Sequence, residues 1–123
     1  MAKDHVYTLG IEEEFAIVDP ETRELRSHIQ EILEGGKVLL KEQIKPEMHQ
    51  SVVELGTEIC PDIRCARDHV VDLRSKLAQL AGERGLRIAS VGTHPFSHWC
   101  DQLLSWGKYL QAAVGKRALS ELA

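Results

Sequence analysis

The chain has 123 residues, of which 43% are hydrophobic and 28% charged, and its formal net charge is −4. A chain of this length and balance fits one globular domain that buries a core without disulfide bonds. The acidic balance argues against a nucleic-acid binder, which usually has a basic face, and no apolar window reaches the length of a membrane span. Three cysteines without a disulfide-rich pattern, after a polar N-terminus, predict a cytoplasmic protein.

The first predicted element is a strand over residues 5–18, where β-branched and aromatic residues dominate. Turn-forming residues close this strand at 19–22. Ser27 then fits the N-cap of a short helix over residues 28–34, and we expect the two glycines that follow, at 35 and 36, to end it.

A second strand is predicted over residues 47–59, "EMHQSVVELGTEI", after a stretch at 37–45 that no pattern assigns. Gly56 within this strand indicates a bulge or a close backbone approach. A bulge would change which side chains share a face of the strand.

The clearest element is a long helix over residues 62–84. Asp62 fits its N-cap, and Gly85 fits a left-handed residue that ends it. Apolar residues at alternating steps of three and four form one stripe along this helix. The stripe consists of Ile63, Ala66, Val70, Leu73, Leu77 and Leu80.

The last part of the chain is expected to hold a third strand over residues 86–92, the loop "THPFSHW", and a helical segment from about residue 98. We expect the aromatic residues of that segment to cover the core. They are Trp99, Trp106 and Tyr109.

The charges in the first two strands decide the predicted fold class. Alternating strands and helices alone would suggest a parallel sheet, but strands buried on both faces of such a sheet are continuously apolar. An antiparallel sheet with helices on one face leaves the other face open to charged side chains. We therefore predict an α+β fold with a largely antiparallel sheet packed by helices, in one domain over residues 1–123.

Three adjacent glutamates in "GIEEEF", residues 10–15, form the first candidate site. Alternation along a strand puts Glu12 and Glu14 on one face and Glu13 on the other, so two carboxylates repel each other at close range. Oxygen ligands suit Mg²⁺ or Mn²⁺ and not zinc. Water on an open face would also satisfy these carboxylates, and the motif alone favours that simpler interpretation.

The second strand repeats the pattern with Glu47, Glu54 and Glu58. Glu54 and Glu58 share a face if no bulge intervenes, whereas Glu47 faces the other way in a regular strand. If the two strands are neighbours, their same-side carboxylates form one acidic patch. A bound metal then explains the pattern better than hydration does.

Three blocks of the sequence together resemble the N-terminal part of the type 2 glutamate–cysteine ligases, also called carboxylate–amine ligases. The blocks are "TLGIEEEFAIVDPET", "EMHQSVVELGTEICPDI" and "VGTHPFSHW", in family order, and they cover most of residues 7–100. The resemblance implies a glutamine-synthetase-like fold, in which an antiparallel sheet forms a funnel with metal ions on its acidic inner face. It also implies that ATP phosphorylates the γ-carboxylate of glutamate and that the amine of cysteine, or of another acceptor, attacks the acyl phosphate to form a γ-glutamyl amide.

By this resemblance, Glu12, Glu14 and Glu54 are expected to bind Mg²⁺ or Mn²⁺. Phosphoryl transfer depends largely on positioning and charge neutralisation, and metal-binding carboxylates on rigid strands serve both. No Walker-type glycine-rich loop occurs in the chain, which is consistent with ATP bound through metal ions.

Four further residues are expected to contact ATP or a substrate. Glu47 matches an acidic family position at the mouth of the same site. Thr57 and Glu58 match the family's "TEIC" motif, for which the resemblance leaves a substrate role and a metal role open. His94 in "GTHPF" belongs to a loop, where sites often lie. It could bind a substrate or a phosphate, or it could be a loop histidine hydrogen-bonded only to backbone.

The cysteines and the charged face of the long helix are predicted to have structural roles and not to form a functional site. Cys60 and Cys65 lack the second pair, or the histidines at matching spacing, that a zinc site usually needs. His69 lies off the apolar stripe and is expected to be solvated. The arginines of the helix, including Arg74, are expected to form a solvated face with local ion pairs.

Members of the resembled family are considerably longer than 123 residues, so this chain is expected to be the N-terminal portion of a longer catalytic domain. Alone it is expected to be inactive, to self-associate through exposed sheet edges, or both. Two alternatives remain open at this point. The chain could be a non-catalytic α+β module that oligomerises or binds a partner, or a plain divalent-metal-binding domain.

Overall fold

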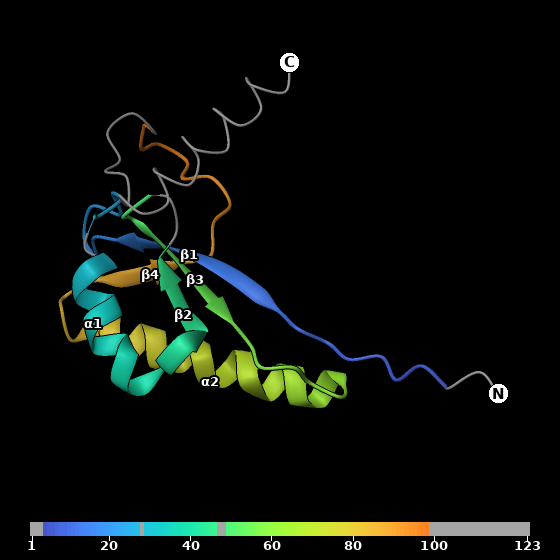
Figure 1. Cartoon of the computed structure of the whole chain (residues 1–123). Coiled ribbons are helices and arrows are strands. Elements are labelled where there is room, and N and C mark those ends of the chain that lie inside the picture. The colour runs from blue at the N-terminus through green and yellow to red at the C-terminus, as the bar shows by residue number, and fades with distance from the viewer. Residues whose placement is uncertain (1–3, 28, 47–48, 99–123) are drawn as a thin grey trace, which may run out of the picture.

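A computed structural model describes residues 4–27, 29–46 and 49–98 of the chain (Figure 1). These residues form a four-stranded antiparallel sheet and two α-helices, so the predicted α+β class and antiparallel sheet are confirmed. The predicted helix from residue 98, with its aromatic residues Trp99, Trp106 and Tyr109, lies outside the described residues, as does Glu47. Within the described ranges, neither helix combines the length and apolarity needed to cross a membrane.

The sheet has the strand order β2-β3-β1-β4, with β1 (Glu12–Val18) between β3 (Val52–Gly56) and β4 (Arg87–Ala89). The short strand β2 (Ile44–Pro46) forms one edge and β4 the other. The strands are shorter than predicted. Among the described residues before β1, the chain pairs with the segment after β3 only through hydrogen bonds between Ile11 and Thr57 and an isolated bridge between Leu9 and Cys60.

The register of β1 against β3 is continuous, with Glu12 opposite Gly56, Glu14 opposite Glu54 and Ala16 opposite Val52. The predicted bulge or close approach at Gly56 is therefore wrong. Gly56 pairs regularly, and a Cβ atom built on it would have no neighbour within 4 Å. The regular register keeps the side-chain alternation of both strands intact through their full length.

The helix α1 (Ile29–Leu39) runs through Gly35 and Gly36 instead of ending there. A Cβ atom on Gly36 would lie 3.1 Å from two side-chain carbons of Ile44, and one on Gly35 would lie 3.2 Å from Leu80 Cδ2. The two glycines thus allow α1 to approach β2 and the second helix closely. Tertiary packing overrides their usual role as helix terminators.

The helix α2 (Ile63–Gly82) follows the prediction closely. Asp62 is its N-cap, with Oδ1 accepting a hydrogen bond of 2.9 Å from the backbone N–H of Cys65. Gly85 has a φ of +67°, and the N–H of Leu86 donates to the carbonyl of Ala81 over 2.9 Å, which is the helix-ending arrangement that the sequence indicated. Two residues of the predicted stripe depart from full burial, since Ile63 is 68% exposed and Val70 is half-buried.

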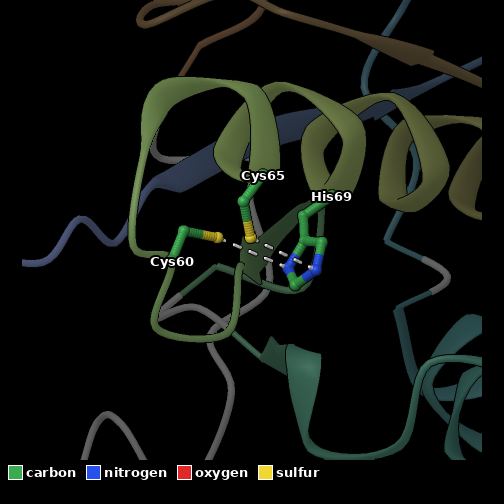
Figure 2. Close-up of side chains that lie close together, drawn as sticks. All are labelled: Cys60, Cys65 and His69. Carbon is green, nitrogen blue, oxygen red and sulfur yellow. Dashed lines mark hydrogen bonds between the residues drawn. The ribbon is translucent and has the colours of Figure 1, made fainter.

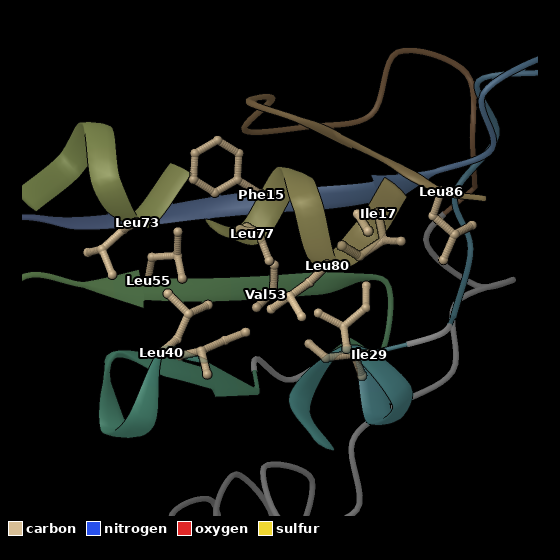
Figure 3. Close-up of a cluster of buried hydrophobic side chains, with 13 residues drawn as sticks. Phe15, Ile17, Ile29, Leu40, Val53, Leu55, Leu73, Leu77, Leu80 and Leu86 are labelled. Carbon is tan, nitrogen blue, oxygen red and sulfur yellow. The ribbon is translucent and has the colours of Figure 1, made fainter. Parts of the chain in front are cut away.

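Both helices pack on one face of the sheet, where alternate side chains of the strands form the core (Figure 3). β1 contributes Phe15 and Ile17, and β3 contributes Val53 and Leu55. The helices cover these side chains with two sets of apolar residues. The sets are Ile29 and Ile32 from α1, and Leu73, Leu77, Leu80 and Ala81 from α2.

The Asp62 cap gives a test of the helix assignment. Replacing Asp62 with alanine leaves a first-turn N–H without its acceptor and is expected to lower the free energy of unfolding by about 1 kcal/mol. Asp68→Ala is the matched control, because Asp68 is an exposed residue of the same helix with only a 3.9 Å ion pair to its neighbour Arg67. Urea unfolding followed by circular dichroism measures both changes. Equal losses in the two variants would contradict the capping role.

Candidate functional site

The three consecutive glutamates are divided between the two faces of β1. Glu13 faces the helices and pairs with Arg74 of α2, whose Nε donates to Glu13 Oε2 over 2.9 Å, with a second contact between Arg74 Nη2 and Glu13 Oε1. The arginine also lies over the ring of Phe15, 5.9 Å from its centroid. Glu13 is thus a packing residue, and its carboxylate raises the pKa of Arg74. The expectation of only local ion pairs on α2 is wrong for Arg74, whose partner is 61 positions away.

Glu12 and Glu14 lie on the opposite, open face of the sheet and are exposed. Glu14 is the direct cross-strand partner of Glu54, and Glu54 is in turn the partner of Lys45 on β2. Residues directly opposite each other in an antiparallel pair have Cβ atoms about 4.5–5.5 Å apart and share a face. The structure therefore brings Glu12, Glu14 and Glu54 to one acidic patch, next to one lysine.

The donor chemistry of this patch suits a hard divalent cation, because all three side chains offer carboxylate oxygens. Among the described residues, the three carboxylates do not form a group with one oxygen from each within 4.8 Å of the others. Metal binding would therefore need rotation of the side chains about a fixed backbone register. Glu12 and Glu14 are exposed and Glu54 half-buried, so the first two have room to rotate.

A cavity of about 680 Å³ adjoins the patch where β1 begins and β3 ends. Glu12, Thr57 and Glu58 line this cavity, together with Lys41 and Lys45. It therefore combines carboxylates with two positive charges, a mixture that suits an anionic ligand held partly through a cation. The two lysines were missed in the sequence because no pattern assigned residues 37–45.

Thr57 and Lys41 shape the wall of the cavity. The hydroxyl oxygen of Thr57 accepts a hydrogen bond of 3.0 Å from the backbone N–H of Ile11, and the N–H of Thr57 donates to the carbonyl of Ile11 over 2.9 Å. These two bonds continue the pairing of β1 and β3 beyond Gly56. Lys41, the first residue of the 3₁₀ helix η1 (Lys41–Gln43), has a φ of +51°, which is unusual for a residue with a side chain. Glu58 lies beyond the end of β3 and is exposed.

His94 lies at the other end of β1, away from the acidic patch. It lines a separate cavity of about 310 Å³ with Val18, the last residue of β1. Its Nε2 donates to the carbonyl of Arg23 over 2.8 Å, and its Nδ1 accepts from the N–H of Ser97 over 3.1 Å. Both ring nitrogens are thus engaged with backbone, and the role of His94 in substrate binding stays a prediction.

The turn that presents the Arg23 carbonyl to His94 is organised by Asp19. Oδ1 of Asp19 accepts hydrogen bonds from the backbone N–H groups of Glu21 and Thr22, over 2.8 and 2.9 Å. Arg26 Nη2 donates to the other carboxylate oxygen over 3.1 Å. The bonds from Thr22, Glu21 and Arg26 stabilise the ionised form and lower the pKa of Asp19 to about 2. The histidine and this turn form one structural unit.

A second cluster of ligand-type side chains lies at the start of α2, where Cys60, Cys65 and His69 meet (Figure 2). The expectation that His69 is solvated is wrong, because its ring is half-buried against both thiols. Cys65 and His69 are four residues apart on one helix and therefore share a face. The spacing from Cys65 to His69 was the signal in the sequence that could have indicated this cluster.

Comparisons with known proteins agree on one family. A family model described as glutamate–cysteine ligase family 2 matches residues 8–112. The chain is 56% identical over 113 residues to a protein of Chloroflexus aurantiacus named "Putative glutamate--cysteine ligase 2", and the match covers 92% of this chain and 29% of that protein. Proteins with the same name are 60% identical over 99 residues in Roseiflexus sp. (80% and 26%) and 54% identical over 113 residues in Sorangium cellulosum (90% and 30%). The chain thus spans less than a third of the length of these relatives.

Adjacent glutamates on opposite faces give a test of the site geometry. Glu14→Gln removes one of two like charges directly opposite each other and is expected to leave the metal-free chain equally stable, or more stable by roughly 0.2–1 kcal/mol. Glu13→Gln is the matched control, and it is expected to lower the urea midpoint because it weakens the two-bonded contact with Arg74. Urea unfolding in chelator measures both variants. A loss of stability in Glu14→Gln as large as that in Glu13→Gln would contradict the assignment of faces.

Proposed function

The chain belongs to glutamate–cysteine ligase family 2, and from this premise we propose that it is the N-terminal part of an ATP-dependent carboxylate–amine ligase. In the proposed reaction, the γ-carboxylate of glutamate takes the terminal phosphoryl group of ATP, and the amine of cysteine or of a related acceptor then displaces phosphate from the acyl phosphate. A γ-glutamyl amide bond forms and ADP and phosphate leave. The observation that carries the proposal is the cross-strand pair of Glu14 and Glu54, with Glu12 on the same open face.

The acidic patch is the proposed metal site. Glu12, Glu14 and Glu54 would hold Mg²⁺ or Mn²⁺, which when bound supplies positive charge against the phosphates of ATP. The protein's contribution is the rigid register of β1 and β3, which fixes the three backbone positions. Concentrated negative charge on an open sheet face costs stability in the absence of a cation, and such a cost is typical of a binding site.

The cavity beside the patch is the proposed place of the anionic and amino groups of the ligands. Lys41 and Lys45 are suited to phosphate or to a substrate carboxylate, because each provides a mobile ammonium group. Glu58, at the cavity wall, is suited to the amino group of a substrate, and Thr57 positions the backbone beside it. Glu47, which was predicted to contact ATP or a substrate, is proposed to contribute to the same ligand site.

Catalysis is proposed for the longer protein and not for these 123 residues alone, because the chain covers only 29% of its Chloroflexus relative. The two edge strands, β2 and β4, have only three residues each. We propose that further strands extend the sheet at these edges and complete the funnel, and that the isolated chain self-associates there instead. The family match does not favour the non-catalytic alternative.

A chimera tests the proposed activity at full family length. In it, the segment of this chain that matches the Chloroflexus relative replaces the corresponding 113 residues of that relative. We expect ADP release that depends on both glutamate and an amine acceptor, and a γ-glutamyl product of the matching mass. Glu14→Gln is expected to lower the turnover by more than about 100-fold, since even outer-shell changes at metal sites cost about 10–100-fold.

The chimera has two controls. Glu13→Gln, next to Glu14 but on the opposite face, should keep turnover within a few-fold of the unmodified chimera. The parent relative is assayed in parallel. An active parent beside a folded but inactive chimera would contradict the proposed function of this segment.

Calorimetric titration of the 123-residue chain with Mn²⁺ tests the metal site separately from catalysis. The unmodified chain is expected to give a saturable binding heat, and the double variant Glu12→Gln, Glu14→Gln is expected to lose it, because neutral amides cannot replace two carboxylates around a hard cation. Identical binding heats for the unmodified chain and the double variant would contradict a metal site on this face of the sheet.

A further inference from the structure

The cluster of Cys60, Cys65 and His69 has the dimensions of a metal site. Cys60 Sγ lies 3.7 Å from His69 Nδ1, and Cys65 Sγ lies 3.9 Å from His69 Nε2 (Figure 2). One ligand atom from each residue can be chosen so that all three lie within 4.8 Å of one another. Around a tetrahedral Zn²⁺ with ordinary bond lengths, a sulfur and a nitrogen ligand are about 3.6 Å apart. The two sulfurs approach different ring nitrogens, of which only one can bind an ion, so side-chain rotations must bring both sulfurs to the same nitrogen around that ion.

The backbone holds the three residues in place. Cys65 and His69 are one turn apart near the start of α2, and the Asp62 cap fixes the N–H of Cys65. Cys60 precedes the helix, and two backbone hydrogen bonds of 2.8 Å with Leu9 anchor it, one in each direction. The ligands thus come from two separately fixed segments, as a preorganised metal site requires.

We propose that Cys60, Cys65 and His69 bind a borderline or soft transition-metal ion of the Zn²⁺ class, with water or another small donor in the fourth position. Two thiolates and one imidazole suit such an ion and do not suit Mg²⁺. On binding, the two thiols release their protons to solvent, while the imidazole binds through one nitrogen and keeps its proton on the other. No electron transfer is involved.

The environment of Cys60 argues against a reactive nucleophile at this position. Its side chain is fully buried, and its Sγ lies 3.4 Å from the carbonyl oxygen of Glu58. The neighbouring Cys65 thiol, followed by burial, raises the pKa of Cys60 to about 11. Burial keeps Cys60 away from reagents in solution, whereas a bound cation would displace the thiol proton and stabilise the thiolate.

The position of the cluster indicates a structural role beside the proposed ligase site. Cys60 ends the connection from β3 that carries Thr57 and Glu58, while the other two ligands belong to α2. A cavity of about 170 Å³ beside His69 is also lined by Glu58, which lines the larger cavity as well. A bound ion would therefore tie one wall of the ligand cavity to the long helix. This proposal does not depend on the ligase reaction.

Titration of the reduced 123-residue chain with Co²⁺, as a spectroscopic substitute for Zn²⁺, tests the site. We expect one equivalent to bind with the d–d bands of tetrahedral cobalt and an intense thiolate-to-cobalt charge-transfer band, which Zn²⁺ abolishes and Mg²⁺ leaves unchanged. Cys65→Ser and His69→Gln are each expected to weaken binding by at least about 100-fold, beyond the 10- to 100-fold typical of outer-shell changes. Both positions are only half-buried, so these variants disturb the core less than a change at Cys60 would.

Two controls separate this site from other binding. Cys100→Ser removes the remaining cysteine and should leave the cobalt spectrum unchanged. The double variant Glu12→Gln, Glu14→Gln should lose the Mn²⁺ binding heat but keep the cobalt spectrum. Cys65→Ser should lose the cobalt spectrum but keep the Mn²⁺ binding heat. The two proposed metal sites are therefore tested independently of each other. A folded, fully reduced chain without the thiolate–cobalt band would overturn the proposal. So would undiminished cobalt binding by folded Cys65→Ser and His69→Gln variants.

Discussion

The architecture of this chain depends on strict alternation along β1. Phe15 and Ile17 enter the core on one face, and Glu13 reaches from that same face to Arg74 of α2. Glu12 and Glu14 lie on the opposite face, and the unbroken register with β3 places Glu54 on that same face. One strand therefore anchors the helices and presents carboxylates at the same time. A shift of the register by a single residue would exchange the two roles and would bury the charges.

Two kinds of ligand chemistry are kept apart around this strand. Among the described residues, Glu12, Glu14 and Glu54 present carboxylate oxygens on the open face of the sheet beside Lys45, and this face suits a hard cation with its anionic ligands. The start of α2 offers sulfur and imidazole nitrogen and suits a softer ion. Glu58 lies in the wall between the two regions, since it lines the cavities on both sides. Local donor type, more than net charge, separates the two proposed sites.

Local patterns in the sequence were sufficient for much of this arrangement, including the long helix with its Asp62 cap and the shared face of the acidic residues. They failed where contacts between distant segments decide the outcome. Gly36 locally resembles a helix terminator, yet it lies inside α1, where Ile44 packs closely against it. Lys45 belongs to a strand too short to give a pattern. The cluster of His69 with the two cysteines is local, and the spacing of four residues between Cys65 and His69 on α2 was overlooked in the sequence.

The central claim is that the carboxylates on β1 and β3 hold a divalent cation on the open face of the sheet. Paramagnetic broadening by substoichiometric Mn²⁺, measured on the backbone amide resonances of the 123-residue chain, locates that ion directly. The account predicts that broadening centres on residues 12–14 and 54–56. Broadening centred on any other region, or uniform weak broadening over the whole chain, would contradict it.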